Sequence, residues 1–213
     1  VAFLDADGNP QSATVTQAGH DGALLLDEQD TVPVCPSYYN STYFDEIYHA
    51  RTAYEHLHGL STYEWTHPPL GKVLMMVGIQ LFGMTPFGWR FMGALMGVLM
   101  VPLMYLLTKQ LTKSTKLSFT AMFLLSVDSM HFTQTRIATI DSYAVFWIML
   151  MYFFMFRYCQ MSWRTKRDFR RSLVTLGLCG VTMGVAWATK WIGFYASAGL
   201  AVLFFWTLWR HGR

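Results

Sequence analysis

The chain has 213 residues, of which 53% are hydrophobic and only 14% are charged. A soluble domain carries about 25% charged residues, and a core of this size does not need 8 Trp, 16 Phe and 14 Met, so the composition favours a membrane protein. The net charge of +3 is too small to indicate nucleic-acid binding, and the three scattered cysteines are too few for a disulfide scaffold or a zinc site.

Residues 1–42 are polar and rich in turn-forming residues. We expect turns at Asp7-Gly8-Asn9-Pro10 and Asp21-Gly22, and Ala13–Thr16 and Ala23–Leu26 are candidate strands. No stretch here is apolar enough to span a bilayer. We interpret the sequence as a fragment of a longer polytopic protein.

The next two elements are expected to be helices that do not cross the membrane. Residues 44–58 predict an amphipathic helix, with apolar residues at helical spacing and Gly59 at its end. Val73–Met84 is apolar but only about a dozen residues long, which favours an interfacial or re-entrant helix over a span. If this segment did cross, residues 45–72 would lie on the opposite side of the membrane from Asp141.

From Gly88 onward the sequence predicts about five transmembrane helices. Each apolar run has about 17–20 residues, close to the thickness of a hydrocarbon core at 1.5 Å per residue. The runs are Trp89–Thr108, Leu117–Thr133, Ile140–Phe156, Leu173–Thr189 and Trp191–Trp209. The last two would make a single helix of about 55 Å, too long for one span, so we expect a tight turn at Lys190.

The basic residues predict the orientation of these helices. Eleven of the sixteen fall on alternate connections: Lys109, Lys113, Lys116, Arg157, Arg164, Lys166, Arg167, Arg170, Arg171, Arg210 and Arg213. Cationic short loops stay in the cytoplasm. The segment before Gly88, the 134–141 connection and the Lys190 turn are therefore expected to face outward.

Outward-facing ionisable residues are the candidates for function, because charges near membrane depth are costly. They are Asp45, Glu46, His67, Lys72, Arg90, Arg136, Asp141 and Lys190. Structural alternatives remain open. Asp45 and Glu46 would then be first-turn acids favoured by the helix dipole, Arg90 and Lys190 would extend to the lipid headgroups, His67 would be a surface histidine, and Arg136 would pair with Asp141.

Two further patterns lie in the predicted spans. Asp128, His131 and Gln134 form one polar face that either lines a cavity or packs against another helix. Gly93-x-x-x-Gly97 predicts close helix packing, and Pro102 predicts a kink in the same helix.

Taken in order, several motifs resemble the protein O-mannosyltransferases, and bacterial members most closely. The motifs are Phe44-Asp45-Glu46, His67-Pro68-Pro69-Leu70-Gly71-Lys72, Arg90, Arg136-Ile137-Ala138-Thr139-Ile140-Asp141 and Thr189-Lys190-Trp191. The resemblance covers about residues 43–209. It implies the C-type glycosyltransferase fold and a sugar donor linked to a polyprenyl or dolichyl phosphate.

The resemblance also implies a role for each site residue. Asp45 would be the general base, and Glu46 would position the acceptor or the donor. His67 and Arg90 would contact the donor phosphate, and Asp141 would contact the sugar or support the residues that do. Arg136, Lys190 and Lys72 are further candidates for substrate binding, and neither a metal nor a cofactor is expected.

General chemistry agrees with this assignment. A lipid-linked donor presents its phosphate at the headgroup plane, where cationic side chains can hold it. The attacking hydroxyl needs a carboxylate to take its proton, and the departing phosphate needs positive charge nearby.

We therefore expect an all-α polytopic membrane fragment that carries an outward catalytic segment. Residues 1–42 would be an extracytoplasmic loop or the end of an inserted domain, 43–87 the juxtamembrane catalytic segment, and 88–213 the transmembrane region. The function would be transfer of a mannosyl-type sugar to Ser/Thr of exported protein, at the outer face of a bacterial plasma membrane or at the ER membrane in a eukaryote. Its partners would be the bilayer, the lipid-linked sugar and an acceptor protein or polymer.

Three alternatives remain. The same fold could glycosylate a lipid or a cell-envelope polymer. A transporter would explain polar residues at membrane depth, but transporters concentrate them near the midplane and show internal repeats, which this sequence lacks. A purely structural membrane subunit would not need the ordered set of polar motifs.

Overall fold

The computed structural model describes residues 5, 7, 9, 37 and 39–211. The chain divides into two compact units, Val1–Thr42 and Tyr43–Arg213. Most of the first unit, including the candidate strands and the expected turn at Asp21-Gly22, lies outside the described residues. Of the other expected turn, the Asp5 carboxylate accepts hydrogen bonds from the backbone N–H groups of Asp7, at 3.0 Å, and Asn9, at 2.8 Å.

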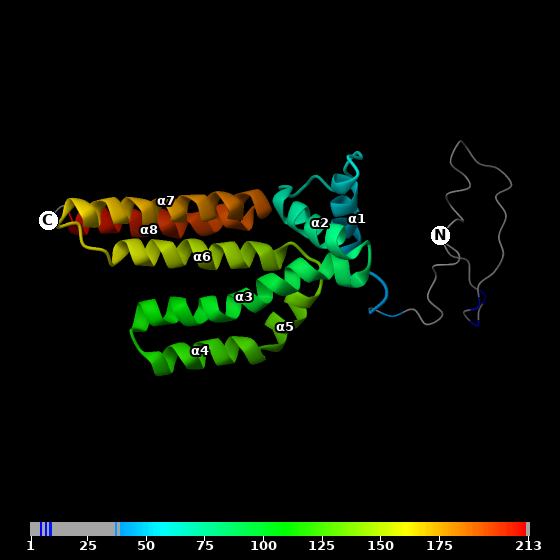
Figure 1. The fold of residues 1–213 in the computed structure, drawn as a ribbon, viewed down its shortest axis with the longest axis horizontal. Coiled ribbons are helices and arrows are strands. Elements are labelled where there is room, and N and C mark those ends of the chain that lie inside the picture. Colours follow the sequence, from blue (N-terminus) through cyan, green and yellow to red (C-terminus); the bar gives the residue numbers. More distant parts are fainter. Residues whose placement is uncertain (1–4, 6, 8, 10–36, 38, 212–213) are drawn as a thin grey trace. The chain divides into compact units, whose positions relative to one another are not determined.

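The described part of the second unit is built from helices alone, which confirms the all-α prediction. In chain order they are α1 (Glu46–Leu57), α2 (Leu70–Phe82), α3 (Pro86–Thr112), α4 (Thr115–Val127), α5 (Ser129–Arg136), α6 (Asp141–Cys159), α7 (Lys166–Thr189) and α8 (Ile192–His211). The long helices α3, α6, α7 and α8 run side by side with α4, and the short helices α1, α2 and α5 gather at one end of this bundle (Figure 1).

Four helices, α3, α6, α7 and α8, are long and apolar enough to cross a membrane. They confirm four of the five predicted spans. The prediction of one continuous span over Leu117–Thr133 is wrong, because α4 ends at Val127 and α5 begins at Ser129. Asp128 causes the break: its backbone is extended, and its carboxylate accepts a hydrogen bond from the backbone N–H of His131 at 2.6 Å, which caps α5.

Two further helices and the turn at Lys190 lie where the sequence predicts them. The amphipathic segment forms α1, and the short apolar segment forms α2, whose 13 residues extend only about 20 Å. α7 ends at Thr189 and α8 begins at Ile192, so a tight turn at Lys190 joins the last two spans.

The basic connections lie at the end of the bundle opposite α1 and α2 (Figure 1). The α3–α4 connection touches the α6–α7 connection there, since Lys113 Nζ donates a hydrogen bond to Gln160 Oε1 at 2.6 Å and Gln160 Nε2 donates one to the carbonyl of Gln110 at 3.0 Å. The two largest groups of cations predicted to be cytoplasmic therefore share one end of the molecule.

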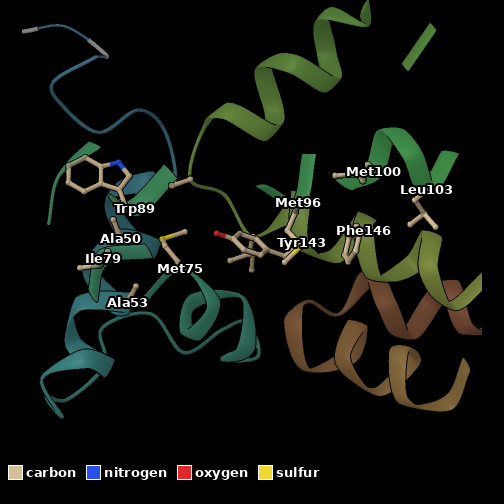
Figure 2. Close-up of a cluster of buried hydrophobic side chains, with 12 residues drawn as sticks. Ala50, Ala53, Met75, Ile79, Trp89, Met96, Met100, Leu103, Tyr143 and Phe146 are labelled. Carbon is tan, nitrogen blue, oxygen red and sulfur yellow. The ribbon is translucent and has the colours of Figure 1, made fainter. Parts of the chain in front are cut away.

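One hydrophobic core fixes the short helices to the bundle (Figure 2). It includes Ala50 of α1, Met75 of α2, Met96 of α3 and Tyr143 of α6, all buried. A second cluster joins α6, α7 and α8 further along the bundle. The positions of α1 and α2, and of any polar groups that they carry, are therefore set by packing and not only by loops.

Glycines allow the closest helix contacts. A Cβ at Gly97 would lie 2.5 Å from Thr135 Cβ, which confirms the close packing predicted for Gly93-x-x-x-Gly97. At Gly78 of α2, a Cβ would lie 2.4 Å from the carbonyl oxygen of Gly88 at the start of α3. The contacted atom at Gly78 is backbone, so it has little freedom to move away.

We predict that Gly78→Ala lowers the thermal unfolding midpoint of the protein, because overpacking a well-filled contact costs about 1–3 kcal/mol. Gly180→Ala in α7 is the matched control, since nothing lies within 4 Å of a Cβ built there. Thermal unfolding in detergent measures both. Equal midpoints for the two variants would contradict the tight α2–α3 contact.

Candidate functional site

A buried carboxylate connects three parts of the chain at the α1 end of the bundle. Glu46, the first residue of α1, is 0% exposed. Its Oε1 accepts hydrogen bonds from Arg90 Nε and from the backbone N–H of Ala138, both at 2.7 Å. Its Oε2 accepts from Arg90 Nη2 at 2.7 Å and from the backbone N–H of Tyr43 at 2.6 Å. This two-pronged ion pair ties the start of α1 to α3 and to the segment before α6.

This contact argues against the structural alternatives given above for Arg90 and Glu46. Arg90 pairs with a buried acid, so extension to the headgroups does not account for its position. Glu46 accepts hydrogen bonds from Arg90 and Ala138, which lie far along the chain. A favourable interaction with the dipole of its own helix therefore does not account for all of its contacts. Neither carboxylate oxygen of Glu46 is exposed for a substrate in this arrangement.

Asp45 lies next to this fixed point and is accessible. It immediately precedes α1, its side chain makes no capping hydrogen bond, and it is partly exposed. Phe44 before it has φ 55°, a left-handed conformation that is rare for a bulky residue and occurs mainly at functional or strained sites. Within the described part of the chain, no group donates a hydrogen bond to the Asp45 carboxylate, so it can accept one from a substrate.

One histidine lies beside Asp45, and a second lies next to the first. His49 is one helical turn after it and buried, and the His49 and His67 ring centroids are 6.4 Å apart. The Nδ1 atoms of both rings are buried without a hydrogen-bond partner. Burial lowers the pKa of His49 below its usual 6.5, although the nearby Glu64 and Asp45 carboxylates offset part of this effect. Sequence reasoning selected His67 and missed His49, whose signal was its spacing of four residues from Asp45 on one helix face.

Lys72 is 1% exposed and holds the loop before α2. Its ammonium pairs with the Glu64 carboxylate and donates hydrogen bonds to the carbonyls of Glu64, at 3.1 Å, and His67, at 3.0 Å. Glu64 also accepts from the backbone N–H groups of Thr66, at 2.8 Å, and His67, at 3.1 Å. The Lys72 ammonium is therefore bonded to Glu64 and His67 in the loop before α2. Glu64 had no signal in the sequence, because nothing in a non-helical loop indicates which cation it meets.

The Glu64 contacts make stability depend on pH. Burial alone would raise the pKa of Glu64, but the hydrogen bonds from Lys72, Thr66 and His67 outweigh it and lower the pKa from 4.5 to about 2. The folded pKa is depressed, so the stabilisation is complete above pH 4.5 and is lost as the pH falls toward 2.

We predict that Glu64→Gln lowers the free energy of unfolding near neutral pH, and that the difference from wild type shrinks below pH 4.5. Thermal midpoints measured in detergent between pH 7 and pH 3 test this. A wild-type minus variant difference that stays constant over this range would contradict the assigned ion pair.

Asp141 and Lys190 form a second polar group at the same end of the bundle. Lys190 Nζ lies 2.7 Å from Asp141 Oδ1, which joins the start of α6 to the α7–α8 turn. Asp141 therefore pairs with Lys190, whereas the guanidinium of Arg136 lies over the Phe132 ring at 5.3 Å from its centroid. The Asp141 side chain remains 48% exposed.

The two polar groups are connected through the protein. Trp191 Nε1 donates a hydrogen bond to the carbonyl of Thr66, next to His67, at 3.0 Å. The backbone N–H of Ala138, three residues before Asp141, donates to Glu46. Asp45, Glu46, His67, Lys72, Arg90, Asp141 and Lys190 therefore take part in, or lie beside, these bonded groups at one end of the bundle.

A cavity of about 380 Å³ opens between α3, α5 and α6. Asp141, His131 and Gln134 line it together with apolar side chains such as Met100 and Val145. The polar face predicted for His131 and Gln134 does line a cavity, while Asp128 caps α5 instead. Asp45, His67 and Arg90 are not part of this lining. Of the predicted site residues, Asp141 alone lines this cavity.

Comparison with known proteins decides the family. Residues 82–212, more than half of the chain, match the family described as dolichyl-phosphate-mannose-protein mannosyltransferase. The chain belongs to this family.

Among the described residues no group of three or more His, Cys, Asp or Glu could hold a metal ion.

Named relatives agree with the family. The chain is 30% identical over 180 residues to the polyprenol-phosphate-mannose–protein mannosyltransferase of Mycobacterium tuberculosis, a match that covers 71% of this chain and 33% of the relative. It is also 30% identical over 166 residues to the protein of that name from Corynebacterium glutamicum, covering 69% and 31%. The chain therefore spans about a third of the length of the curated relatives it matches.

The fold has a solved counterpart. The crystal structure of ArnT from Cupriavidus metallidurans in the apo state superposes with a TM-score of 0.65 at 22% identity, covering 80% of this chain and 33% of that one. The C-type glycosyltransferase fold expected from the sequence is confirmed. With four membrane-spanning helices and this family, the chain is part of an integral membrane protein.

Proposed function

We propose that the full-length protein transfers a mannosyl residue from a polyprenyl phosphate to Ser or Thr hydroxyls of exported protein, at the outer face of the membrane. The observation that carries the proposal is Asp45: a partly exposed carboxylate without a described hydrogen-bond donor, fixed in place by the buried ion pair of its neighbour Glu46. A general base needs this combination of access and fixed position. Family membership favours an enzyme over the transporter and structural alternatives.

Asp45 acts as the base in a direct displacement. The acceptor oxygen forms a bond to the anomeric carbon while the bond from that carbon to the phosphate oxygen breaks. The proton of the acceptor hydroxyl passes to the Asp45 carboxylate, and the lipid phosphate leaves with the electron pair. A single displacement inverts the anomeric centre. We expect this reaction to need neither a metal nor a cofactor.

Cationic groups at the same end of the bundle stabilise the departing phosphate. His67 is the first candidate, because its ring centroid lies 6.4 Å from that of His49, one helical turn after Asp45, and its loop is held by Lys72. Lys190 and Arg136 are further candidates on the neighbouring turns, and Asp141, half-exposed beside Lys190, can accept a hydrogen bond from a sugar hydroxyl.

Arg90 and Lys72 receive a different role in this proposal from the one that the resemblance implied. Both are bonded to buried or nearly buried acids, Arg90 to Glu46 and Lys72 to Glu64. We assign them, together with Glu46, to positioning: they hold Asp45 and the His67 loop at a fixed distance from each other.

The cavity beside Asp141 suits the lipid part of the donor. Its wall includes the apolar side chains of Met100, Met130 and Val145 from α3, α5 and α6, together with polar residues that include the Asp141 carboxylate. A donor whose first isoprene units lay there would present its phosphate and sugar next to Asp141 and Lys190. The basic connections at the other end of the bundle support the outward orientation.

The test is product analysis with the purified full-length protein in liposomes. The protein is given synthetic polyprenyl-phosphate mannose and a peptide with one Ser/Thr cluster. The control peptide has Ala at those positions. The proposal predicts a mass increase of one hexose on the first peptide alone. A hexose found on lipid or polymer and never on peptide would support the alternative acceptor, and absence of any transfer would contradict the proposed reaction.

A further inference from the structure

The end of the bundle far from Asp45 carries a second cavity with a different character. It has a volume of about 900 Å³ and lies between the end of α6 and the first turns of α7. Four arginines line it: Arg157, Arg167, Arg170 and Arg171. Val174 and Leu178 continue its wall along α7, where both side chains are exposed.

The α7 residues of this cavity lie on one helix face. Positions 167, 170, 171, 174 and 178 follow the i, i+3, i+4 spacing of helix neighbours, with all the charges at the N-terminal end and the apolar residues beyond them. The distance along the helix from 167 to 178 is about 16 Å, roughly the depth of one leaflet of hydrocarbon. Along this face the side chains thus change from cationic to apolar over about the same depth as a phospholipid changes from its charged headgroup to its acyl chains.

The arginines have no described counter-charge. No ion pair joins any of the four to a described acid, and the one acid in residues 157–178, Asp168, bonds to the Thr165 hydroxyl at 2.7 Å at the start of α7. Four like charges within a few turns repel one another, so an anion placed among them lowers the free energy of the protein. Guanidinium groups bind phosphate oxygens with two parallel hydrogen bonds.

We propose that this cavity binds an anionic phospholipid of the surrounding leaflet, with its phosphate among the arginines and one acyl chain against Val174 and Leu178. Charge complementarity selects an anionic headgroup, and the apolar wall selects a lipid over a free phosphate ion. This site is separate from the sugar-transfer site and does not depend on the proposed reaction.

The test uses the purified full-length protein in detergent, titrated with phosphatidylglycerol or phosphatidylcholine, with bound lipid counted by native mass spectrometry. Arg170→Gln/Arg171→Gln removes two of the four charges. Both side chains are exposed, so the variant is expected to fold. The matched control is Arg164→Gln/Arg210→Gln, which removes two exposed charges at the same end that line a neighbouring cavity and not this one.

The proposal predicts that wild type and control retain phosphatidylglycerol. It also predicts that Arg170→Gln/Arg171→Gln binds it about 25-fold more weakly, since each arginine near a membrane surface strengthens binding by about a factor of five. Inorganic phosphate at the same concentration should not displace the lipid. Equal retention of phosphatidylcholine, displacement by free phosphate, or unchanged binding by Arg170→Gln/Arg171→Gln would each overturn it. The last result is the one expected if another part of the full-length chain covers the cavity.

Discussion

Asp45→Asn in the full-length protein should reduce the rate of sugar transfer by about 10²–10⁴-fold while leaving donor binding near wild type. Asparagine keeps the size of the side chain but cannot take the proton of the acceptor hydroxyl. The loss therefore appears in kcat and not in the affinity for polyprenyl-phosphate mannose. Single-turnover transfer from a radiolabelled donor gives the rate, and donor binding is measured separately without acceptor.

Asp168→Asn is the matched control for this experiment. Asp168 is an acid at the opposite end of the bundle and lies in the first turn of α7, as Asp45 lies at the start of α1. Its substitution should leave transfer unchanged. Wild-type turnover by Asp45→Asn would exclude Asp45 as the base.

The second large effect is expected at the buried ion pair. Glu46→Gln leaves one acceptor oxygen where the carboxylate has two and removes the negative charge that pairs with Arg90, and breaking one side of a buried pair costs about 3–5 kcal/mol. We predict a lower thermal midpoint together with a loss of transfer, because α1, α3 and the segment before α6 are no longer held together at Asp45. Thermal unfolding and transfer assays on the same preparation measure both.

A double-variant cycle separates the ion pair from general damage. Arg90→Met alone should also destabilise, since it leaves the buried Glu46 carboxylate uncompensated. The combination Glu46→Gln/Arg90→Met should be more stable than the sum of the two single effects predicts, because neither charge is then unpaired. Additive losses would contradict a direct bond between these two side chains.

The sequence predicted the elements whose signal is local. The length of each apolar run identified α3, α6, α7 and α8 as spans, and the amphipathic spacing identified α1. The alternation of basic connections predicted which ends would meet, and the hydrogen bonds of Gln160 join two of them. These features depend on composition and periodicity over short windows, which a single sequence contains.

The break at Asp128 was missed because averaging over an apolar run hides one polar residue. The spacing predicts that Asp128 belongs to a polar helix face, whereas its side chain caps α5. A capping residue and a face residue have the same identity and differ only in backbone conformation, which the sequence does not record.

Ion pairs between residues far apart in the sequence could not be predicted, for a different reason. Glu46 and Arg90 are 44 positions apart, and Asp141 and Lys190 are 49 apart, so helix packing alone determines that they meet. The sequence offered Arg136 as an equally reasonable partner for Asp141. It also gave no reason to prefer His49 or Glu64 over other polar residues between α1 and α2, and both become candidates only once the fold surrounds them.

We expect the Asp45 end of the bundle to face outward and the arginine-rich end to face the cytoplasm. Labelling single cysteines with a membrane-impermeant maleimide tests it in intact cells that produce a full-length protein without its native cysteines. Leu60→Cys reports the end with Asp45, where Leu60 is 55% exposed, and Arg164→Cys reports the other end. We predict labelling of Leu60→Cys in intact cells and of Arg164→Cys only after the cells are permeabilised. Labelling of both from outside, or of Arg164→Cys alone, would contradict this orientation.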